Sequence, residues 1–450
     1  QQLNVEIKEV LRFLNLSRIE SDASSFSFSS ESESGAEGGG SSRGEGPRTV
    51  RDIIASGRGL ILTSVKKTLL DSALTHTALR RSNEQKPEVK IMTEGARLGS
   101  AATVFEQAAA ALRGVPDHIL RSRRPPNKSG LFPGLSVSFE DEDAVGDEGP
   151  YLQLFSTISE EVADITVSDI LFYTFLFLCC SRPHSPLSPP STHTHHSTAT
   201  LQKESRLAMF TATPSSVESS ERTLVPLPSA CGAKELAAFE FLGRLVGIAL
   251  RTGATLPLNM PRVVWKRLVR VSSPVYSRFS LSFTHTARTS VPRVVGILTH
   301  FLPTTQTHIT QVGQRLAERD LKGVDDAFLA RINGVAQPSS EEEWEALQSG
   351  PDAVRWTVRL SDRTESALIA PPSTKASSSV ESPSSSSALV PFVLRDEWRR
   401  QAIDARLHES PLQIDALRRG FTAIVPPSIL SLLTARELEH WTSWRPTIDI

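Results

Sequence analysis

The chain has 450 residues, of which 39% are hydrophobic and 22% charged, and its formal net charge at pH 7 is −1. This balance excludes a global basic field that would draw the protein to nucleic acid or an anionic membrane, so binding to either would need a local patch. Three cysteines cannot form a disulfide framework, and their sparsity is typical of a reducing cytoplasmic or nuclear compartment.

Residues 1–48 are predicted to be an upstream segment that ends in a disordered linker. The stretch at 21–46 consists largely of serine, glycine and glutamate, a composition that cannot bury enough apolar surface to offset the ordering of the backbone. The opening QQLNVEIKEV lacks a methionine, a basic segment and a long apolar core. We therefore expect a fragment of a longer protein, without a secretory signal.

Residues 49–134 are predicted to be a helical region that leads into the main domain. Thr49 and Asp52 have capping-box-like spacing before one or two helices. PEVKI is a strand candidate, and SAATVFEQAAAALRG is an alanine-rich helix ended by Gly114 and Pro116. Beyond this region, alternating polarity at 135–139 predicts another strand. The helix after that strand carries four apolar residues: Leu152, Leu154, Phe155 and Ile158.

Three irregular stretches interrupt this pattern, at 163–199, 271–311 and 371–387. Neither of the first two continues an adjoining helix, and long structureless insertions inside a compact lobe are uncommon. We predict that both lie outside the natural fold, as unspliced or mis-joined sequence, and that the third is a solvated loop. The apolar run ILFYTFLFLCC in the first stretch has about half of the roughly 20 residues that a bilayer requires, so no membrane span is expected.

The segment FEFLGRLVGIALRTGATLPLNMPRVVWKRLV at 239–269 predicts a helical hairpin in a core. Gly243 and Gly247 lie on one stripe of its first helix. Each glycine costs a helix about 1 kcal/mol relative to alanine, so we expect another helix to use the space. Asn259 and Pro261 form a candidate cap and first turn for the second helix.

The segment RDEWRRQAIDARLHESPLQIDALRRGF at 395–421 has apolar residues at helical spacing. Gly420 follows two arginines, where a glycine commonly ends a helix, so the helix is predicted to stop there. After two prolines, Thr434 and Glu437 form a T-x-x-E capping box for a final short helix.

These segments resemble, in the same order, the amino-terminal lobe of HECT-type ubiquitin ligases, and especially the HERC-like class. FLGRLVGIA, PL and VWKRL are similar to the helical pair of that lobe, and LSVSFEDEDAVGDEGPY, LVPLPSAC, VPFVLRDEWRRQAIDARLHES and IDALRRGFTAIVPPSILSLLTARELE are similar to its other parts. The resemblance covers about half of the chain, between Thr49 and Glu439. The residues assigned to its structural motif are Phe241, Leu242, Gly243, Gly247, Pro257, Trp265, Lys266, Arg406 and Gly420.

The resemblance implies a mainly α (α+β) fold, a HECT-like lobe of helices with a few short strands over 135–450, and disordered linkers. Such ligases accept ubiquitin as a thioester on their own cysteine and pass it to a substrate lysine. That cysteine belongs to a carboxy-terminal lobe, and no cysteine follows Cys231. We therefore expect this lobe to be absent, assign no catalytic residue, and expect the chain to be inactive alone.

The partners implied by the resemblance are a ubiquitin-conjugating enzyme and ubiquitin, with no cofactor, metal, nucleic acid or membrane. In the family the conjugating enzyme docks on a small subdomain, which corresponds loosely to 321–369. The match is poor there, so no docking residue is carried over. Two alternatives stay open: a non-catalytic remnant that binds conjugating enzymes or ligase partners, and a mostly disordered scaffold with a small helical core.

The cysteines are interpreted as ordinary residues. Cys231 precedes the core helix, where the helix amino terminus and Lys234 would favour a thiolate, but a loop cysteine is the simpler interpretation. Cys179 and Cys180 end an apolar run, where burial would disfavour a thiolate.

Three other clusters are interpreted as solvated. The acidic run at 140–148 is expected to be a turn rather than a cation site. One histidine cluster lacks the regular pairing that a structural zinc site needs; it comprises His184, His193, His195 and His196. A small basic patch lacks interleaved aromatic residues and is not expected to bind nucleic acid; it comprises Arg121, Arg123, Arg124 and Lys128.

Overall fold

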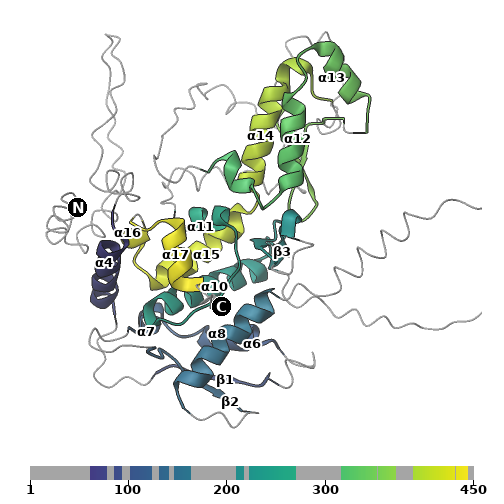
Figure 1. Ribbon diagram of the computed structural model, residues 1–450. Helices are drawn as coiled ribbons and strands as arrows, with labels where there is room; N and C mark the ends of the chain where they lie inside the picture. The colour runs from purple at the N-terminus through teal and green to yellow at the C-terminus, as the bar shows by residue number, and fades with distance from the viewer. Residues whose placement is uncertain are drawn as a thin grey trace, which may run out of the picture.

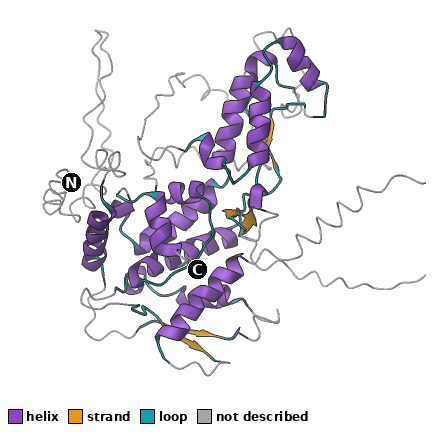
Figure 2. Cartoon of the chain, in the orientation of Figure 1, coloured by secondary structure: helices purple, strands orange, loops and turns teal. Residues whose placement is uncertain are grey.

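The computed structural model is mainly helical, as predicted, and Figures 1 and 2 show a main body from which a second group of helices projects. Within the described residues the strands form three two-stranded sheets. The upstream segment, the Thr49–Asp52 pair, Cys179, Cys180, the histidine cluster and nearly all of the three irregular stretches lie outside the described residues. The described ranges are 61–78, 86–93, 102–123, 131–140, 146–163, 209–216, 222–269, 316–351, 353–370, 389–430 and 432–443.

Two helices cross at the centre of the main body (Figure 1). Helix α10 spans Ala233–Thr252, helix α15 spans Pro411–Ile424, and each buries at least half of its residues. A Cβ atom on Gly243 would lie 1.9 Å from the carbonyl oxygen of Leu417, and one on Gly247 would lie 2.7 Å from the Cβ of Ile424. The prediction that these glycines admit a crossing helix is confirmed.

Gly420 belongs to the same crossing, and the prediction that it ends a helix is wrong. It lies inside α15, where a Cβ atom would be 1.7 Å from the carbonyl oxygen of Glu240. The helix continues to Ile424, and Val425 then takes the extended conformation favoured before Pro426. A glycine near the end of a helical pattern suits a cap or a close helix contact, and here the contact with α10 decides.

The segment before Gly420 forms two helices rather than one. Helix α14 spans Arg395–Leu407, and α15 begins at Pro411, which takes the first helical position. Proline suits this position because its fixed φ matches the helix and its missing N–H needs no partner there. The connection through Glu409 and Ser410 therefore separates the two helices.

Four further helices surround the crossing pair: α4 (Thr63–His76), α11 (Arg262–Val269), α16 (Pro427–Leu430) and α17 (Ala435–Ser443). The predicted capping box of α17 is confirmed, because the N–H and hydroxyl of Thr434 each donate to Glu437 Oε2 at 2.9 Å and the Glu437 N–H donates to Thr434 Oγ1. Lys66 of α4 also donates to both oxygens of Glu437, at 3.0 and 2.8 Å. One carboxylate thus caps α17 and attaches α4 to it.

A layer of strands and helices packs against the other side of α10. Its elements are β1 (Glu88–Ile91), α6 (Val104–Leu112), α7 (Asp117–Leu120), β2 (Ser136–Phe139) and α8 (Glu148–Ala163). The two predicted strands are confirmed and pair in parallel, with Val89 opposite Val137. Parallel strands need a crossover connection, and α6 and α7 supply it.

Helix α8 is confirmed, but only three of its four named apolar residues face inward. Leu154, Phe155 and Ile158 are fully buried, whereas Leu152 is 45% exposed. The buried stripe starts from Tyr151, which lies three, four and seven positions before these residues, as the helical period requires. The hydroxyl groups of Tyr151 and Thr252 form a 3.0 Å hydrogen bond, which attaches α8 to the end of α10.

A short hairpin precedes α10, formed by antiparallel β3 (Phe210–Ala212) and β4 (Leu224–Pro226), with the 3-10 helix η2 (Pro214–Ser216) between them. Asn259 contacts this region, and the prediction that it caps α11 is wrong. Its side-chain amide donates to the carbonyl of Arg222 at 2.8 Å, and its own carbonyl accepts from Leu224. Asn259 therefore holds the start of β4 in place through these two hydrogen bonds.

The projecting group contains η4 (Glu318–Leu321), α12 (Asp326–Ala336), α13 (Glu341–Gln348), β5 (Thr357–Arg359), β6 (Glu365–Ala367), η6 (Phe392–Leu394) and α14. We call the elements from α12 to α14 the small subdomain. Trp398 lies in its hydrophobic cluster, whereas Trp265 lies in the cluster of the main body. Phe328 and Ile403 pack against both clusters, so the two bodies are joined.

Candidate docking subdomain

Three extended segments lie side by side in the small subdomain. Strand β5 pairs with β6, with Thr357 opposite Ala367, and Arg355 forms an antiparallel bridge with Leu389 on the other edge. Continuing this register places Ile369 opposite Arg355. Directly paired residues point to the same face of a sheet, so these side chains form one surface, which we call the outer face: Arg355, Ile369 and Leu389.

The inner face of the same segments is buried and anchored. Trp356, Leu368 and Val390 alternate with the outer-face residues and are all buried. The indole N–H of Trp344 donates to the carbonyl of Val390 at 2.9 Å, and that of Trp398 donates to the carbonyl of Arg355 at 2.7 Å. The segments that carry the outer face are therefore attached to α13 and α14.

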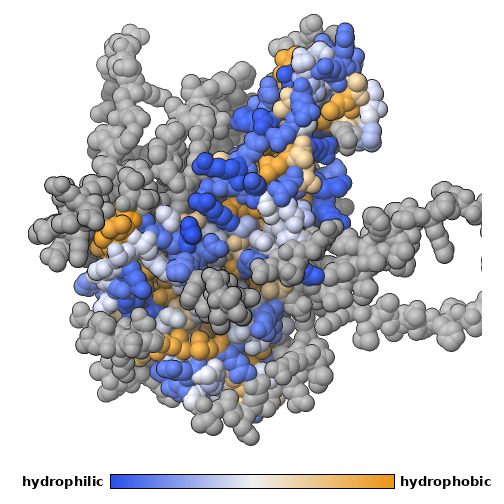
Figure 3. Space-filling model, in the orientation of Figure 1, coloured by the Kyte–Doolittle hydropathy of each residue, from blue (hydrophilic) through white to orange (hydrophobic). Residues whose placement is uncertain are grey.

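The outer face exposes large aliphatic side chains. Ile369 is 65% exposed and Leu389 is 49% exposed. Val393, four residues after Leu389 in η6, is 83% exposed. Figure 3 shows hydrophobic surface on this subdomain among hydrophilic residues. Single exposed aliphatic residues are common, but here two of them flank Arg355 on one face of an anchored sheet, and such grouping is typical of a contact surface.

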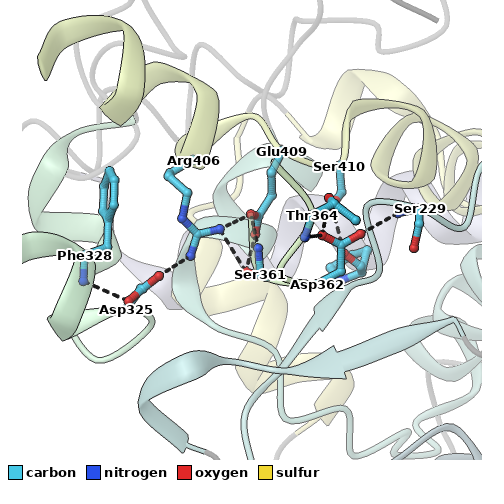
Figure 4. A network of polar contacts seen from close by, with 10 residues as sticks. Ser229, Asp325, Phe328, Ser361, Asp362, Thr364, Arg406, Glu409 and Ser410 are labelled. Carbon is cyan, nitrogen blue, oxygen red and sulfur yellow. Dashed lines mark hydrogen bonds and ion pairs between the residues drawn. The ribbon is translucent and has the colours of Figure 1, made fainter. Parts of the chain in front are cut away.

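Arg406 lies buried where the small subdomain meets the main body (Figure 4). Its guanidinium donates to Asp325 Oδ2 at 2.6 Å, to Ser361 Oγ at 3.0 Å and to Glu409. These partners belong to the start of α12, the β5–β6 turn and the α14–α15 connection. One cation therefore holds three segments together.

Glu409 completes this network. Its carboxylate accepts the hydroxyl of Ser361 at 2.6 Å and its N–H at 3.0 Å. Burial raises the pKa of Glu409, although the charge of Arg406 and the bonds from Ser361 act against that rise. The next turn residue, Asp362, accepts the backbone N–H of Ser229 at 3.1 Å (Figure 4). The tip of the hairpin is thus bonded to the main body.

A second buried pair connects η4 to the main body. Lys266 of α11 lies 2.6 and 2.7 Å from the two oxygens of Asp320, and both residues are buried. Arg399 of α14 also contacts Glu318, at 3.1 Å. Because η4 contacts both α11 and α14, it acts as a rigid spacer between the two bodies.

Comparison with known proteins finds similarity to one family of ligases. Residues 195–349 match the family described as HECT-domain (ubiquitin-transferase). The chain is 27% identical over 224 residues to E3 ubiquitin-protein ligase HERC2 of Homo sapiens, covering 50% of this chain and 3% of that protein. It is 23% identical over 225 residues to Probable E3 ubiquitin-protein ligase HECTD4 of Homo sapiens, covering 49% of this chain and 5% of that protein. The chain is similar to HECT-type, HERC-like ligases over about half of its length.

The motif residues predicted from the sequence lie in three places. Pro257, Trp265 and Lys266 belong to α11 and the turn before it, where the Pro257 carbonyl accepts the hydroxyl of Ser159 at 2.6 Å. Arg406 lies at the junction described above. The remaining motif residues belong to α10 and α15. Gly243, Gly247 and Gly420 lie at the crossing of the two helices, whereas Phe241 and Leu242 are buried residues of α10, and the Phe241 ring packs edge-on against Phe105 of α6. The structure gives all of them packing or positioning roles and does not bring them together at one reactive centre.

Three carboxylates at or near the junction have no role predicted from the sequence: Asp320, Asp325 and Glu409. For Asp325 the local sequence offers a signal, because an aspartate just before a helix commonly caps it. In the structure Asp325 caps α12 and accepts the N–H of Phe328 at 2.9 Å. Glu409 follows its partner Arg406 by three positions, but it also binds Ser361, and Asp320 binds Lys266, both distant in the chain. Sequence spacing alone therefore could not identify these two distant contacts.

Cys231 is the one cysteine among the described residues. Its thiol donates to the carbonyl of Pro228 at 3.0 Å, and it lies 3.4 Å from the side-chain nitrogen of Gln413. Within the described residues no histidine, aspartate or glutamate joins it in a potential metal-binding group. These contacts suit the predicted loop cysteine.

The described part of the predicted basic patch makes contacts within the fold. Arg121 donates to the carbonyl of Ala423 at 2.9 and 3.0 Å, and Arg123 forms an ion pair with Asp71 at 2.8 Å. Arg124 and Lys128 lie outside the described residues, as does most of the acidic run. None of the described helices has the length and apolar character needed to cross a membrane.

Proposed function

We propose that this chain is the docking part of a HECT-type ubiquitin ligase, and that the outer face of its small subdomain binds a ubiquitin-charged conjugating enzyme. The supporting observation is that the HECT match at 195–349 extends into a subdomain with exposed aliphatic residues on an anchored sheet. Ile369 and Leu389 lie on strands that are already held in place, so little conformational entropy is lost when a partner binds them.

The proposed role leaves the thioester step to another part of the ligase. Transfer requires a thiolate that can attack the thioester carried by the conjugating enzyme. The Cys231 thiol donates a hydrogen bond to the carbonyl of Pro228 and lies next to Gln413, so it belongs to the main body and not to the outer face. We propose that the receiving cysteine lies outside the described residues, which the contacts of Cys231 within the main body support.

The buried junction supports this role because a docked enzyme must present its thioester in a defined direction. Lys266 holds the spacer η4 to the main body through Asp320, and Arg406 binds Asp325 and Glu409 where the small subdomain meets the main body. Correct orientation of reacting groups contributes several kcal/mol to a transfer reaction. A docking subdomain held by these contacts would deliver the thioester along one path.

The test measures binding of the 450-residue chain to a panel of ubiquitin-charged conjugating enzymes. The double substitution Ile369→Asp with Leu389→Asp should weaken binding at least about tenfold, equivalent to roughly 1.4 kcal/mol. The matched control is Leu62→Asp with Leu152→Asp, which alters exposed leucines of the main body and should leave binding unchanged.

Circular dichroism should show that both double variants keep their helices. Binding of the outer-face variant at the unmodified strength, or equal weakening by the control pair, would reject the outer face as the docking surface. If no charged enzyme of the panel binds the folded chain, the docking function itself is wrong.

A further inference from the structure

A concavity of about 700 Å³ opens between the start of α11, η4 and α17. Arg406 and the outer-face residues do not line it, so it is distinct from the junction network and from the proposed docking surface. Its volume lies within the roughly 300–1,000 Å³ typical of small-ligand sites. Half of its lining residues are ionisable: Arg262, Lys266, Arg319, Asp320, Lys322 and Glu439.

The charges around the concavity do not cancel. Lys266 and Asp320 neutralise each other through their 2.6 and 2.7 Å contacts. Arg262 interacts electrostatically with Glu439, whose pKa is nevertheless raised by burial. The side chains of Arg319 and Lys322 form no hydrogen bond or ion pair with any described residue. The lining therefore carries two positive charges without anionic partners.

Backbone groups add to the positive potential. Helix α11 begins at Arg262 on the wall of the concavity. The first N–H groups of a helix have no partner within it, and its dipole is positive at that end. This geometry attracts an anion and repels a metal ion. The buried carboxylate cannot offset that repulsion, because Asp320 already accepts from Lys266 and from the N–H of Ala317 at 3.0 Å.

We infer that this concavity binds a small polyphosphate, with Arg319 and Lys322 contacting its phosphate groups. A guanidinium can donate two parallel hydrogen bonds to phosphate oxygens, and an ammonium provides a compact charge beside them. Two unpaired cations in a space of about 700 Å³ suit a ligand with two or more phosphates better than a single carboxylate. The inference uses no outer-face residue and does not depend on the docking function.

The test titrates sodium tripolyphosphate into the 450-residue chain by isothermal calorimetry at roughly physiological ionic strength, about 0.15 M. The unmodified chain should bind in a saturable way. The double variant Arg319→Gln with Lys322→Gln should raise the Kd at least about tenfold. The matched control, Lys67→Gln with Arg359→Gln, removes two exposed cations elsewhere and should change the Kd less than about twofold. All four positions are exposed, and circular dichroism checks that the fold is kept.

Three outcomes would overturn the inference. Absence of binding to the unmodified chain would exclude a polyphosphate site. Equal weakening in the two double variants would show general attraction between charges rather than a defined site. An aspartate-rich hexapeptide that displaces tripolyphosphate and binds more tightly would assign the concavity to an acidic protein segment instead.

Discussion

Replacing Gly243 by alanine should destabilise the main body, although alanine favours helices. The added Cβ would lie 1.9 Å from the carbonyl oxygen of Leu417 and 2.8 Å from the backbone nitrogen of Phe421. Both atoms belong to the backbone of α15, so neither can turn aside as the end of a long side chain can. Since non-bonded atoms prefer a separation of roughly 3.5 Å, the two helices would have to move apart locally by about 1.5 Å.

The expected loss follows from two opposing effects. Overpacking a close-packed core costs about 1–3 kcal/mol, whereas alanine in place of glycine inside a helix gains about 1 kcal/mol. Because backbone must move on both sides of the contact, we take the upper end of the first range. The free energy of unfolding should therefore fall by about 2 kcal/mol.

Urea unfolding followed by far-ultraviolet circular dichroism measures this change, and Gly334→Ala is the matched control. Gly334 also lies inside a helix, α12, but a Cβ atom there would meet nothing within 4 Å. The control should keep the propensity gain of up to about 1 kcal/mol. Equal stability of Gly243→Ala and the unmodified chain, or equal effects of the two substitutions, would refute the reasoning.

Three further substitutions test other contacts. Gly247→Leu should overpack the same crossing by about 1–3 kcal/mol and lower the thermal midpoint; an unchanged midpoint would contradict this. Arg406→Met should cost about 3–5 kcal/mol in urea unfolding because it leaves two acidic partners buried without their cation, whereas exposed Arg359→Met should have little effect; similar losses would argue against the network. Burial acts to raise the pKa of Glu437, but hydrogen bonds from Lys66 and from the capping threonine outweigh it and lower that pKa. The folded state therefore gains stability above the ordinary pKa of glutamate and loses it as the pH falls through the lowered value. Glu437→Gln should be less stable at neutral pH and lose less stability between about pH 5 and pH 3; identical acid profiles of the two proteins would count against this.

The sequence predicted elements whose determinants lie within a few residues of each other. The Thr434–Glu437 capping box and the alternating strand at 135–139 are of this kind, and both are present in the structure. The glycines of α10 also implied a close neighbour, because glycine inside a buried helix is otherwise unfavourable. The neighbour itself could not be named, since α15 lies far along the chain.

Local patterns failed where a distant contact competed with a local role. Gly420 suits a helix end, but its approach to Glu240 places it inside α15. Asn259 suits a helix cap, but its amide bonds to Arg222. In each case the residue type was correctly recognised as special, and tertiary structure selected a different use for it.

The candidate docking surface was only partly predictable. The strand-like character of WTVRLSDRTESALIA at 356–370 corresponds to the β5–β6 hairpin. Leu389, however, joins this sheet after the stretch at 371–387, and its bridge to Arg355 has no local determinant. Likewise, Arg406 acquires its role from partners in separate segments. The family resemblance located the subdomain, but the register of its strands identifies the exposed residues.

The glycine-lined crossing also closes a long loop of the chain. About 160 residues connect the end of α10 at Thr252 to the start of α15 at Pro411. The entropic cost of closing such a loop grows only with the logarithm of its length, so adding or deleting about 40 residues alters the free energy of closure by about 0.2 kcal/mol. Whole stretches such as 271–311 can therefore be inserted into or deleted from this loop at little cost in folding free energy. One added methyl group at the α10–α15 crossing, in contrast, should cost several times more folding free energy.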